Sequence, residues 1–471
     1  MDRRKSNLIL LNVCIGQAIV GLDQRALLVA LPTLTEYFNT AFTTIRWTIL
    51  SYDLVLVGLV ITMGRLGDLF GRRRFYTGGL ILFVTGSALC ILSQTPAQLI
   101  AFRVLQAIGG AMISANGRAI ASVAVPRAER GKALGLTSTA FHVGFLLGPT
   151  LGGFMIDTIG WRWIFSLNIP IGIWGAWLGW KLLAETSEEK QAASIDFTGA
   201  FLLLLTTGVL IYTVDQIPRL GWGHPSILAS SVLAGGAFAA LVLVERRVRT
   251  PILLLSLFGS RLFSAGMSSL FLVAFSQVAL NFLMPFYLQN LRGFSPSQVG
   301  WIIVADSVII MAMAPVAGWL SDRFGSRLLC TSGCALIAIA QLLISTVGLD
   351  SSVLRIVIPL GVQGFGWALF NSPNQSAILS AVPADRVGSA SGMVATAART
   401  GGAMGVALSA TLFSAVLTAA GMSPSQIETP QTWGAVAGTV VAAFNHTVFI
   451  ISLFSMLAVI LSAVRNPKPG H

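Results

Sequence analysis

Long apolar runs alternate with short polar segments along the whole chain. A helix that crosses a bilayer needs about 20 predominantly apolar residues, and fourteen runs come close to or exceed that length. They cover approximately 7–31, 46–66, 75–94, 97–121, 131–155, 163–183, 196–214, 225–244, 264–287, 298–320, 328–347, 353–377, 389–419 and 444–465. The pattern predicts an all-α polytopic membrane protein with fourteen transmembrane helices.

The composition favours a membrane protein over a soluble one. Of the 471 residues, 55% are hydrophobic and 10% are charged, whereas a soluble domain carries about 25% charged residues. The first apolar run follows basic residues, as in a signal peptide, but continues to Pro32 without a convincing cleavage site. We therefore expect this run to be retained as the first helix.

The net charge of +12 is better explained by membrane topology than by nucleic-acid binding. Lysine and arginine lie in short segments between apolar runs, not in a cluster on a soluble face. With the N-terminus inside, the outer segments hold only five of them, Arg46, Arg162, Arg219, Arg292 and Arg355. The positive-inside rule then predicts an inner (cell) membrane protein with both termini in the cytoplasm.

An internal repeat divides the chain. The segment GRLGDLFGRRR (64–74) recurs as GWLSDRFGSRL (318–328), 254 residues later. This repeat predicts an N-terminal six-helix bundle over 1–183 and a C-terminal six-helix bundle over 264–471. The segment 184–263 between them would hold two extra helices and their cytoplasmic linkers.

The repeated segment predicts a tight cytoplasmic turn between two helices. Gly64 and Gly71 permit the turn and a close helix approach, while Asp68 can pair with an arginine such as Arg72 or accept hydrogen bonds from helix amides. Some of the arginines could serve only as topology signals. The second copy supplies Gly318, Asp322 and Gly325.

A block of glycines marks the fifth predicted helix, in GLTSTAFHVGFLLGPTLGG (135–153). Gly144, Gly148 and Gly152 are four positions apart, so they lie on one helix face where a neighbouring helix can approach closely. Pro149 removes a backbone hydrogen bond and can bend the helix. Generic packing of small residues explains single glycines, but not so ordered a block.

These motifs together resemble the major facilitator superfamily, and specifically its fourteen-helix drug:proton antiporters. The resemblance rests on 64–74, on the fifth-helix pattern G-x8-G-x3-G-P-x2-G-G, and on WRWIFSLNIPIG (161–172), GSASGMVATAARTGGAMG (388–405), RVLQAIGGA (103–111) and LDQRALLVALP (22–32). It implies two pseudo-symmetric six-helix bundles plus two central helices, and multidrug efflux. Arg25 stands where the family usually has threonine, Leu28 where it has asparagine, and Ala107 where it has glycine.

Several charged residues interrupt the apolar runs, although a charge at a bilayer centre costs about 2.5–3.5 kcal/mol on insertion scales. Helical rise places Asp23, Asp53 and Asp306 in one layer of the outer half, with Arg25 and Arg103 among them. Being two positions apart, Asp23 and Arg25 face different sides of their helix. We therefore expect each to pair with another helix.

Asp23 is the principal proton-site candidate, with Arg103 as its modulating partner. Burial and a nearby arginine change a carboxylate's affinity for protons in opposite directions, so such a site can load and release a proton. Asp53 and Asp306 are candidates for secondary proton sites or substrate contacts. Alternatively, all these charges form buried ion pairs that only hold the helices together.

The repeat suggests further cavity residues. Adding the repeat offset to Asp23 and to His142 gives Gln277 and Arg399, which would face their counterparts across the central pathway. His142 could titrate near physiological pH or be a hydrogen-bonded packing residue. Arg25, Gln277, Asn281 and Arg399 are candidates for the substrate cavity, although Gln277 and Asn281 could equally bond a neighbouring helix.

The function expected from these features is proton-coupled export of amphipathic or cationic small molecules, such as drugs, dyes or antiseptics, by alternating access. The alternative is a specific carrier for an endogenous metabolite, a lipid or an anionic compound. An enzyme is disfavoured because the sequence has no metal cluster or nucleophile–histidine pair, and a phosphate-binding loop for ATP is lacking. We expect a monomer in a lipid bilayer, with protons and a small-molecule substrate as partners and no nucleic acid. We expect no bound metal and no cofactor apart from the coupling proton, and the four cysteines, Cys14, Cys90, Cys330 and Cys334, have neither zinc-binding nor disulfide-framework spacing.

Overall fold

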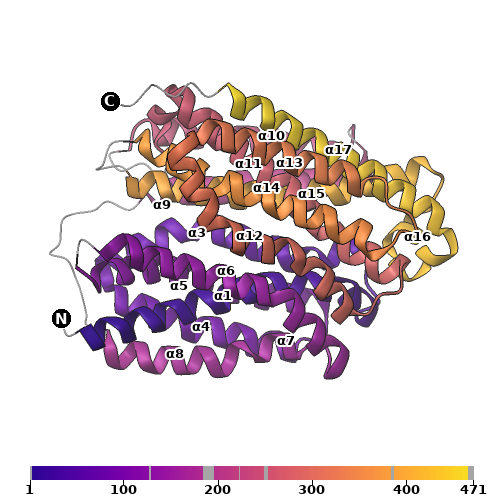
Figure 1. The fold of residues 1–471 in the computed structure, drawn as a ribbon. Coiled ribbons are helices and arrows are strands. Elements are labelled where there is room, and N and C mark those ends of the chain that lie inside the picture. Colours follow the sequence, from indigo (N-terminus) through magenta and orange to yellow (C-terminus); the bar gives the residue numbers. More distant parts are fainter. Residues whose placement is uncertain are drawn as a thin grey trace.

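The computed structural model describes residues 3–126, 129–183, 196–221, 223–248, 253–382 and 387–464. Within these ranges the regular structure is entirely helical, as the apolar runs predict. The helices run roughly side by side, and α1 (Arg3–Tyr37) begins at the end of the molecule where α17 (Ala437–Ala463) ends (Figure 1).

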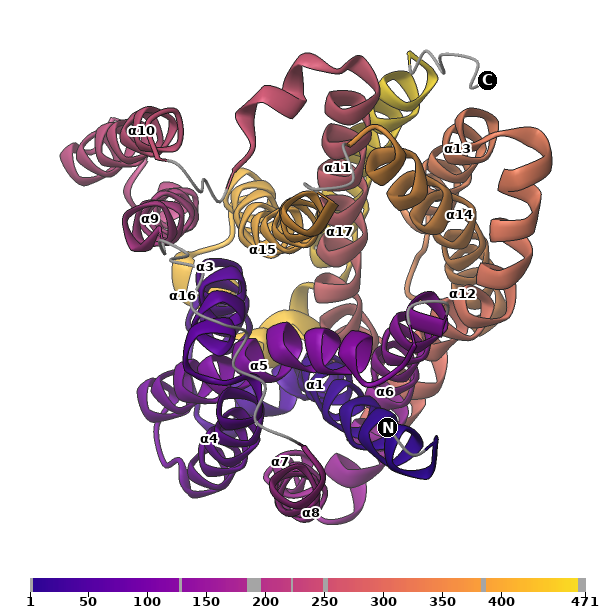
Figure 2. The ribbon, with the colours of Figure 1, turned by 90° about the vertical axis from the view of Figure 1, so that its left-hand side faces the viewer.

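The helices before residue 184 gather in one bundle (Figures 1 and 2). Its members besides α1 are α2 (Phe42–Ile45), α3 (Trp47–Phe70), α4 (Arg72–Leu92), α5 (Pro96–Val123), α6 (Arg130–Thr158), α7 (Trp163–Ser166) and α8 (Asn168–Leu182). A second bundle contains α17 together with α11 (Arg261–Phe286), α12 (Pro296–Phe324), α13 (Ser326–Ile344), α14 (Val353–Ser380), α15 (Val387–Ala419) and α16 (Pro424–Glu428).

The two intervening helices lie at the side of the molecule. Figure 2 shows α9 (Phe197–Leu220) beside α3 and α15, one from each bundle, with α10 (Pro225–Glu245) on its outer side. Arg46, just before α3, forms an ion pair with Asp215 of α9, and the hydroxyl of Thr411 on α15 donates to the Val214 carbonyl at 2.9 Å. Helix α9 is therefore bonded to both bundles.

The expected count of fourteen transmembrane helices is not supported. Twelve helices in the described ranges are long and apolar enough to cross a membrane. The run expected at 163–183 is divided into α7 and a 15-residue α8, which at about 1.5 Å per residue is shorter than a hydrocarbon core of about 30 Å. The run at 353–377 forms α14, which contains Pro359 and Pro373 and is also not among the twelve.

The repeated sequence produces the same turn in both bundles. Gly71 joins α3 to α4 with φ 108°, and Gly325 joins α12 to α13 with φ 78°. Residues other than glycine rarely adopt positive φ values. The prediction of a glycine-dependent turn is therefore confirmed for Gly71 and Gly325, whereas Gly64 and Gly318 lie inside α3 and α12 and are not part of the turns.

One end of the molecule is sealed by aromatic side chains from both bundles. Phe42 lies with its ring 4.7 Å from that of Phe286 on α11, and Phe413 on α15 lies 5.3 Å from Trp433. Trp433 also contacts Phe42 and Phe286. Because these rings are buried against one another, we call this group, together with Phe282, the aromatic seal.

Candidate substrate and proton sites

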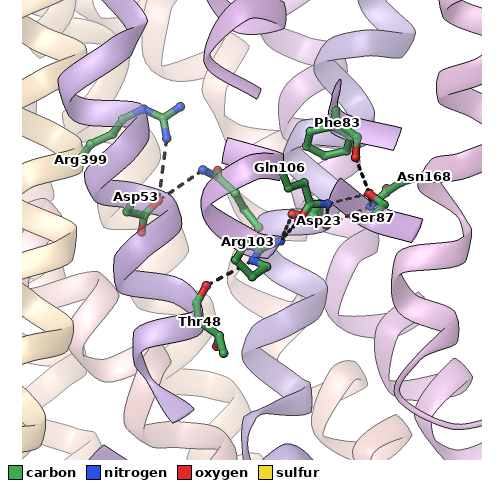
Figure 3. Close-up of polar contacts among 10 residues, drawn as sticks. Asp23, Thr48, Asp53, Phe83, Ser87, Arg103, Gln106, Asn168 and Arg399 are labelled. Atoms are coloured by element: carbon green, nitrogen blue, oxygen red, sulfur yellow. Dashed lines mark hydrogen bonds and ion pairs between the residues drawn. The ribbon is translucent and has the colours of Figure 1, made fainter. Parts of the chain in front are cut away.

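Asp23 lies at the centre of a buried hydrogen-bond network inside the first bundle (Figure 3). Arg103 Nη1 donates to its Oδ2 at 2.5 Å, while Gln106 Nε2 and Asn168 Nδ2 donate to its Oδ1 at 2.8 and 2.9 Å. Three donors thus replace the water that a buried carboxylate loses. The predicted partnership of Asp23 with Arg103 is present.

Arg103 is itself fixed by further contacts. Its Nε donates to the Thr48 carbonyl at 3.2 Å, its Nη1 also reaches Gln106 Oε1 at 2.6 Å, and its guanidinium lies 4.2 Å from the centre of the Tyr52 ring. Ser87 accepts from Gln106 at 2.8 Å. The network therefore ties α1, α3, α4, α5 and α8 into one unit.

Arg25 belongs to a different ion pair, between the bundles. Its Nη2 lies 3.4 Å from Asp306 Oδ2 on α12, and its guanidinium lies 4.3 Å from the centre of the Phe145 ring. Both charged side chains are almost completely buried. The expectation that Asp23 and Arg25 pair across helices, and not with each other, is confirmed.

Asp53 forms a looser connection between the bundles. Arg399 Nη1 on α15 lies 4.0 Å from Asp53 Oδ1 on α3, and Gln24 Nε2 lies 3.5 Å from the same oxygen (Figure 3). The pair is only partly buried, with about a fifth of each side chain exposed. At this separation it is an ion pair too long for a hydrogen bond.

A cavity of about 880 Å³ lies between the bundles and reaches the α3–α4 turn. Of the predicted cavity residues, Arg399 lines it, and so does the proton-site candidate His142, whose Nδ1 lies 2.8 Å from the Ser138 carbonyl oxygen. Gln277 and Asn281 are buried on α11 and, like Arg25, are not part of this wall.

The glycine face of α6 is in direct contact with α1. A Cβ on Gly144 would collide with the Ala18 carbonyl, one on Gly148 would lie 2.8 Å from the Arg25 Cβ, and one on Gly152 would lie 3.0 Å from the Ala26 Cα. Close approach of a neighbour along this face is therefore confirmed. Next to Pro149, the α6 backbone also approaches Gly300 of α12, in the other bundle.

The turn after α3 contains the predicted acid–base pair. Arg72 Nε donates to Asp68 Oδ1 at 2.7 Å, and both residues line the cavity mouth together with Gly64. In the second copy, no side chain would meet a Cβ on Gly318 within 4 Å. The side chain of Asp322 lies outside the described part of the structure.

Several polar residues of these sites lie outside the set predicted from the sequence. Gln106 follows Arg103 by three positions and so shares its helix face, and Asn168 lies in the motif segment 161–172. Sequence position is therefore enough to identify both as candidates. Arg118 lines the cavity without having been singled out. No sequence pattern points to the Arg46–Asp215 pair, because neither residue belongs to a repeat or motif.

Comparisons with known proteins agree with this architecture. The model of the Major Facilitator Superfamily matches residues 13–406. The riboflavin transporter RibZ of Clostridioides difficile (strain 630) is 32% identical over 413 residues, which span 87% of this chain and 89% of that protein. The multidrug resistance protein Stp of Mycobacterium tuberculosis (strain CDC 1551 / Oshkosh) is 31% identical over 88% of this chain and 77% of its own length.

Two further comparisons extend this picture. The tetracenomycin C resistance and export protein of Streptomyces glaucescens is 31% identical over 85% of this chain and 74% of its own length. The crystal structure of a bacterial homologue of the human lysosomal transporter Spinster, inward-facing and unoccupied, superposes with a TM-score of 0.70 at 15% identity over 98% of this chain and 97% of that one. The chain therefore belongs to the Major Facilitator Superfamily, whose members are membrane transporters and not enzymes.

Proposed function

We propose that this protein is a proton-coupled secondary transporter that exports amphipathic small molecules by alternating access. The carrying observation is the asymmetry of the space between the bundles, which holds a cavity of about 880 Å³ at one end and the aromatic seal at the other. Such an arrangement suits a site that opens to one side of a membrane at a time. Relatives named as multidrug resistance and export proteins support the direction of transport.

In this proposal Asp23 carries the coupling proton and Arg103 modulates its affinity. Asp23 is buried and accepts hydrogen bonds from three side chains. It lies on α1, and α1 also packs against the glycine face of α6. Movement of α1 against α5 and α8, which supply these donors, would change the hydrogen bonds around the carboxylate. Asp53, Asp306 and His142 are secondary candidates for protonation.

The remaining features of the proposal are the orientation in the membrane, the oligomeric state, the number of spanning helices and the coupling ion. The arginine-rich cavity mouth faces the cytoplasm, both termini are cytoplasmic, and the protein acts as a monomer in the inner membrane. In this proposal, α7 together with α8 forms one spanning segment and α14 forms another, which completes a set of fourteen in the manner of the drug:proton antiporters. The coupling ion is the proton, and no other cofactor takes part.

A specific carrier for a metabolite or an anionic compound is the second candidate. Two observations favour it: the identity of 32% to a riboflavin transporter and the arginines in the cavity wall. The two candidates differ in breadth of substrates, which competition between unrelated compounds for transport measures directly.

Dye flux in proteoliposomes with an imposed pH gradient tests the proposal. We expect gradient-driven transport of at least one dye from a panel of cationic, neutral and anionic dyes, and its loss in Asp23→Asn, because the amide cannot carry a proton. Glu36→Gln is the matched control, since Glu36 is exposed near the end of the same helix. Full transport in Asp23→Asn would reduce Asp23 to a structural ion-pair member, and absence of dye flux in every variant would favour the specific carrier.

A further inference from the structure

The charges that line the cavity are predominantly basic. Among the described residues, six ionised side chains contribute: the arginines Arg65, Arg72, Arg118 and Arg399, and the aspartates Asp68 and Asp196. Asp68 pairs with Arg72 at 2.7 Å, and Asp196 accepts a hydrogen bond from the Gly199 amide at 2.7 Å. The described part of the wall therefore carries an excess of positive charge.

Two of the arginines lie within helices long and apolar enough to span the membrane. Arg399 is twelve positions into α15, about 18 Å along the helix, and Arg118 is five positions before the end of α5, about 8 Å. Ionisable residues within membrane-spanning helices commonly mark a substrate pathway. These two guanidiniums come from opposite bundles and line the same cavity.

Neither guanidinium is fully neutralised. Among the described residues, no carboxylate lies within ion-pair distance of Arg118, whose Nε donates to the Ser114 carbonyl at 3.3 Å. Within the same part of the chain, the one ionic contact of Arg399 is the loose 4.0 Å approach to Asp53. The two arginines also repel each other electrostatically, and the imidazole ring of His142 lines the same cavity.

We propose that Arg118 and Arg399, with His142 beside them, form the binding site for the anionic group of an amphipathic organic anion. Guanidinium groups bind carboxylates and phosphates through paired hydrogen bonds, and an anion between them would relieve their mutual repulsion. The site excludes substrates whose only charge is positive. This inference rests on the proposed function and specifies the class of substrate that the transporter binds.

In this proposal Asp53 competes with the substrate anion for Arg399. Its carboxylate contacts the same guanidinium that the substrate anion would use. Removing the Asp53 charge should therefore strengthen anion binding, the opposite of what removal of either arginine does. A residue that merely held the helices together would not produce effects of opposite sign.

The test uses a cysteine reporter at Ser138, an exposed cavity residue, in the full chain with its four native cysteines replaced by alanine. Anionic and cationic methanethiosulfonate reagents of similar size are compared, each corrected for its rate with glutathione. We expect the anionic reagent to react about tenfold faster, corresponding to about 1.4 kcal/mol. Arg118→Gln and Arg399→Gln should abolish this preference, Arg118→Lys should retain it, and Asp53→Asn should increase it.

Protection of the reporter then tests binding itself. Fluorescein and rhodamine 123 share a xanthene scaffold but differ in charge, so we expect fluorescein to slow labelling and rhodamine 123 not to. Arg355→Gln removes an exposed arginine near the start of α14, outside the cavity wall, and should change nothing. Protection by rhodamine 123 alone, protection by neither dye, or a charge preference that survives both arginine substitutions would each overturn the proposal. Because labelling needs no pH gradient, these failures are distinguishable from a failure of proton-coupled export, which dye flux reports.

Discussion

Asp23 and Arg25 are two positions apart on α1 but stabilise different parts of the molecule. The helix turns by about 100° per residue, so one side chain faces the core of its own bundle and the other faces α12. Asp23 is satisfied by three donors within its bundle, whereas Arg25 and Asp306 are each other's only ionic partner among the described residues. The first arrangement is independent of how the bundles are oriented, but the second depends on it.

Asp306→Asn should therefore destabilise the protein through the charge it leaves behind on Arg25. Breaking a buried pair by removing one partner costs about 3–5 kcal/mol, whereas replacing both partners with neutral groups is often close to neutral. We expect a lower midpoint of thermal unfolding in detergent for Asp306→Asn, and recovery in the double variant Arg25→Gln/Asp306→Asn. Equal destabilisation in the single and double variants would show that the pair contributes hydrogen bonding and packing, and not charge balance.

At the scale of elements, the contact between α1 and α6 depends on the absence of side chains. Gly144, Gly148 and Gly152 allow the α6 backbone to approach Ala18, Leu22 and Ala26 of α1. In lipid, where the hydrophobic effect does not drive helices together, close packing of this kind supplies much of the association energy. Arg25 takes part in this contact through its Cβ, which lies opposite Gly148, so the contact couples packing to the Arg25–Asp306 pair.

Gly144→Ala tests this contact against a matched substitution in the same helix. Its new Cβ would collide with the Ala18 carbonyl, whereas the Cβ in Gly135→Ala would have no neighbour within 4 Å. Alanine favours a helix over glycine by about 1 kcal/mol, so Gly135→Ala should leave thermal stability and dye flux intact or slightly raise stability. We expect Gly144→Ala to lower both. Similar results for the two variants would contradict a role for close approach.

The sequence predicts those elements that depend only on residues close together in the chain. Apolar runs of spanning length located most helices, and the spacing of Gly144, Gly148 and Gly152 located the face that contacts α1. The division of 163–183 at Leu167 into α7 and α8 is not visible in hydropathy alone, but Pro170 marks it, because proline cannot donate the helical hydrogen bond to the Ser166 carbonyl. The Arg46–Asp215 pair and the cavity position of Arg118 could not be foreseen, because they depend on how helices distant in the sequence pack together.

At the scale of the whole molecule, the two ends of the space between the bundles are in opposite states. The cavity is open beside the α3–α4 turn, while the other end is closed by aromatic rings from both bundles. The Arg25–Asp306 and Asp53–Arg399 contacts lie between the bundles, whereas the Asp23 network lies within one. Reversal of access would require the aromatic seal to separate and the ion pairs between the bundles to rearrange.

Trp433→Ala should shift this balance, because Trp433 contacts rings from three other elements of the seal. Truncation of a buried tryptophan costs about 3–5 kcal/mol, and here most of that cost falls on the state in which the seal is closed. Spin labels at Tyr37→Cys and Leu349→Cys, two exposed positions in different bundles, report the separation at that end. We expect pulsed electron resonance to show a longer and broader distance distribution in Trp433→Ala than in the labelled parent. Exposed Phe449→Ala on α17 is the control for loss of an aromatic ring outside the seal. If both variants keep the parent's distribution, the rings fill space without holding the end closed, and other contacts between the bundles, such as the Arg25–Asp306 pair, hold it.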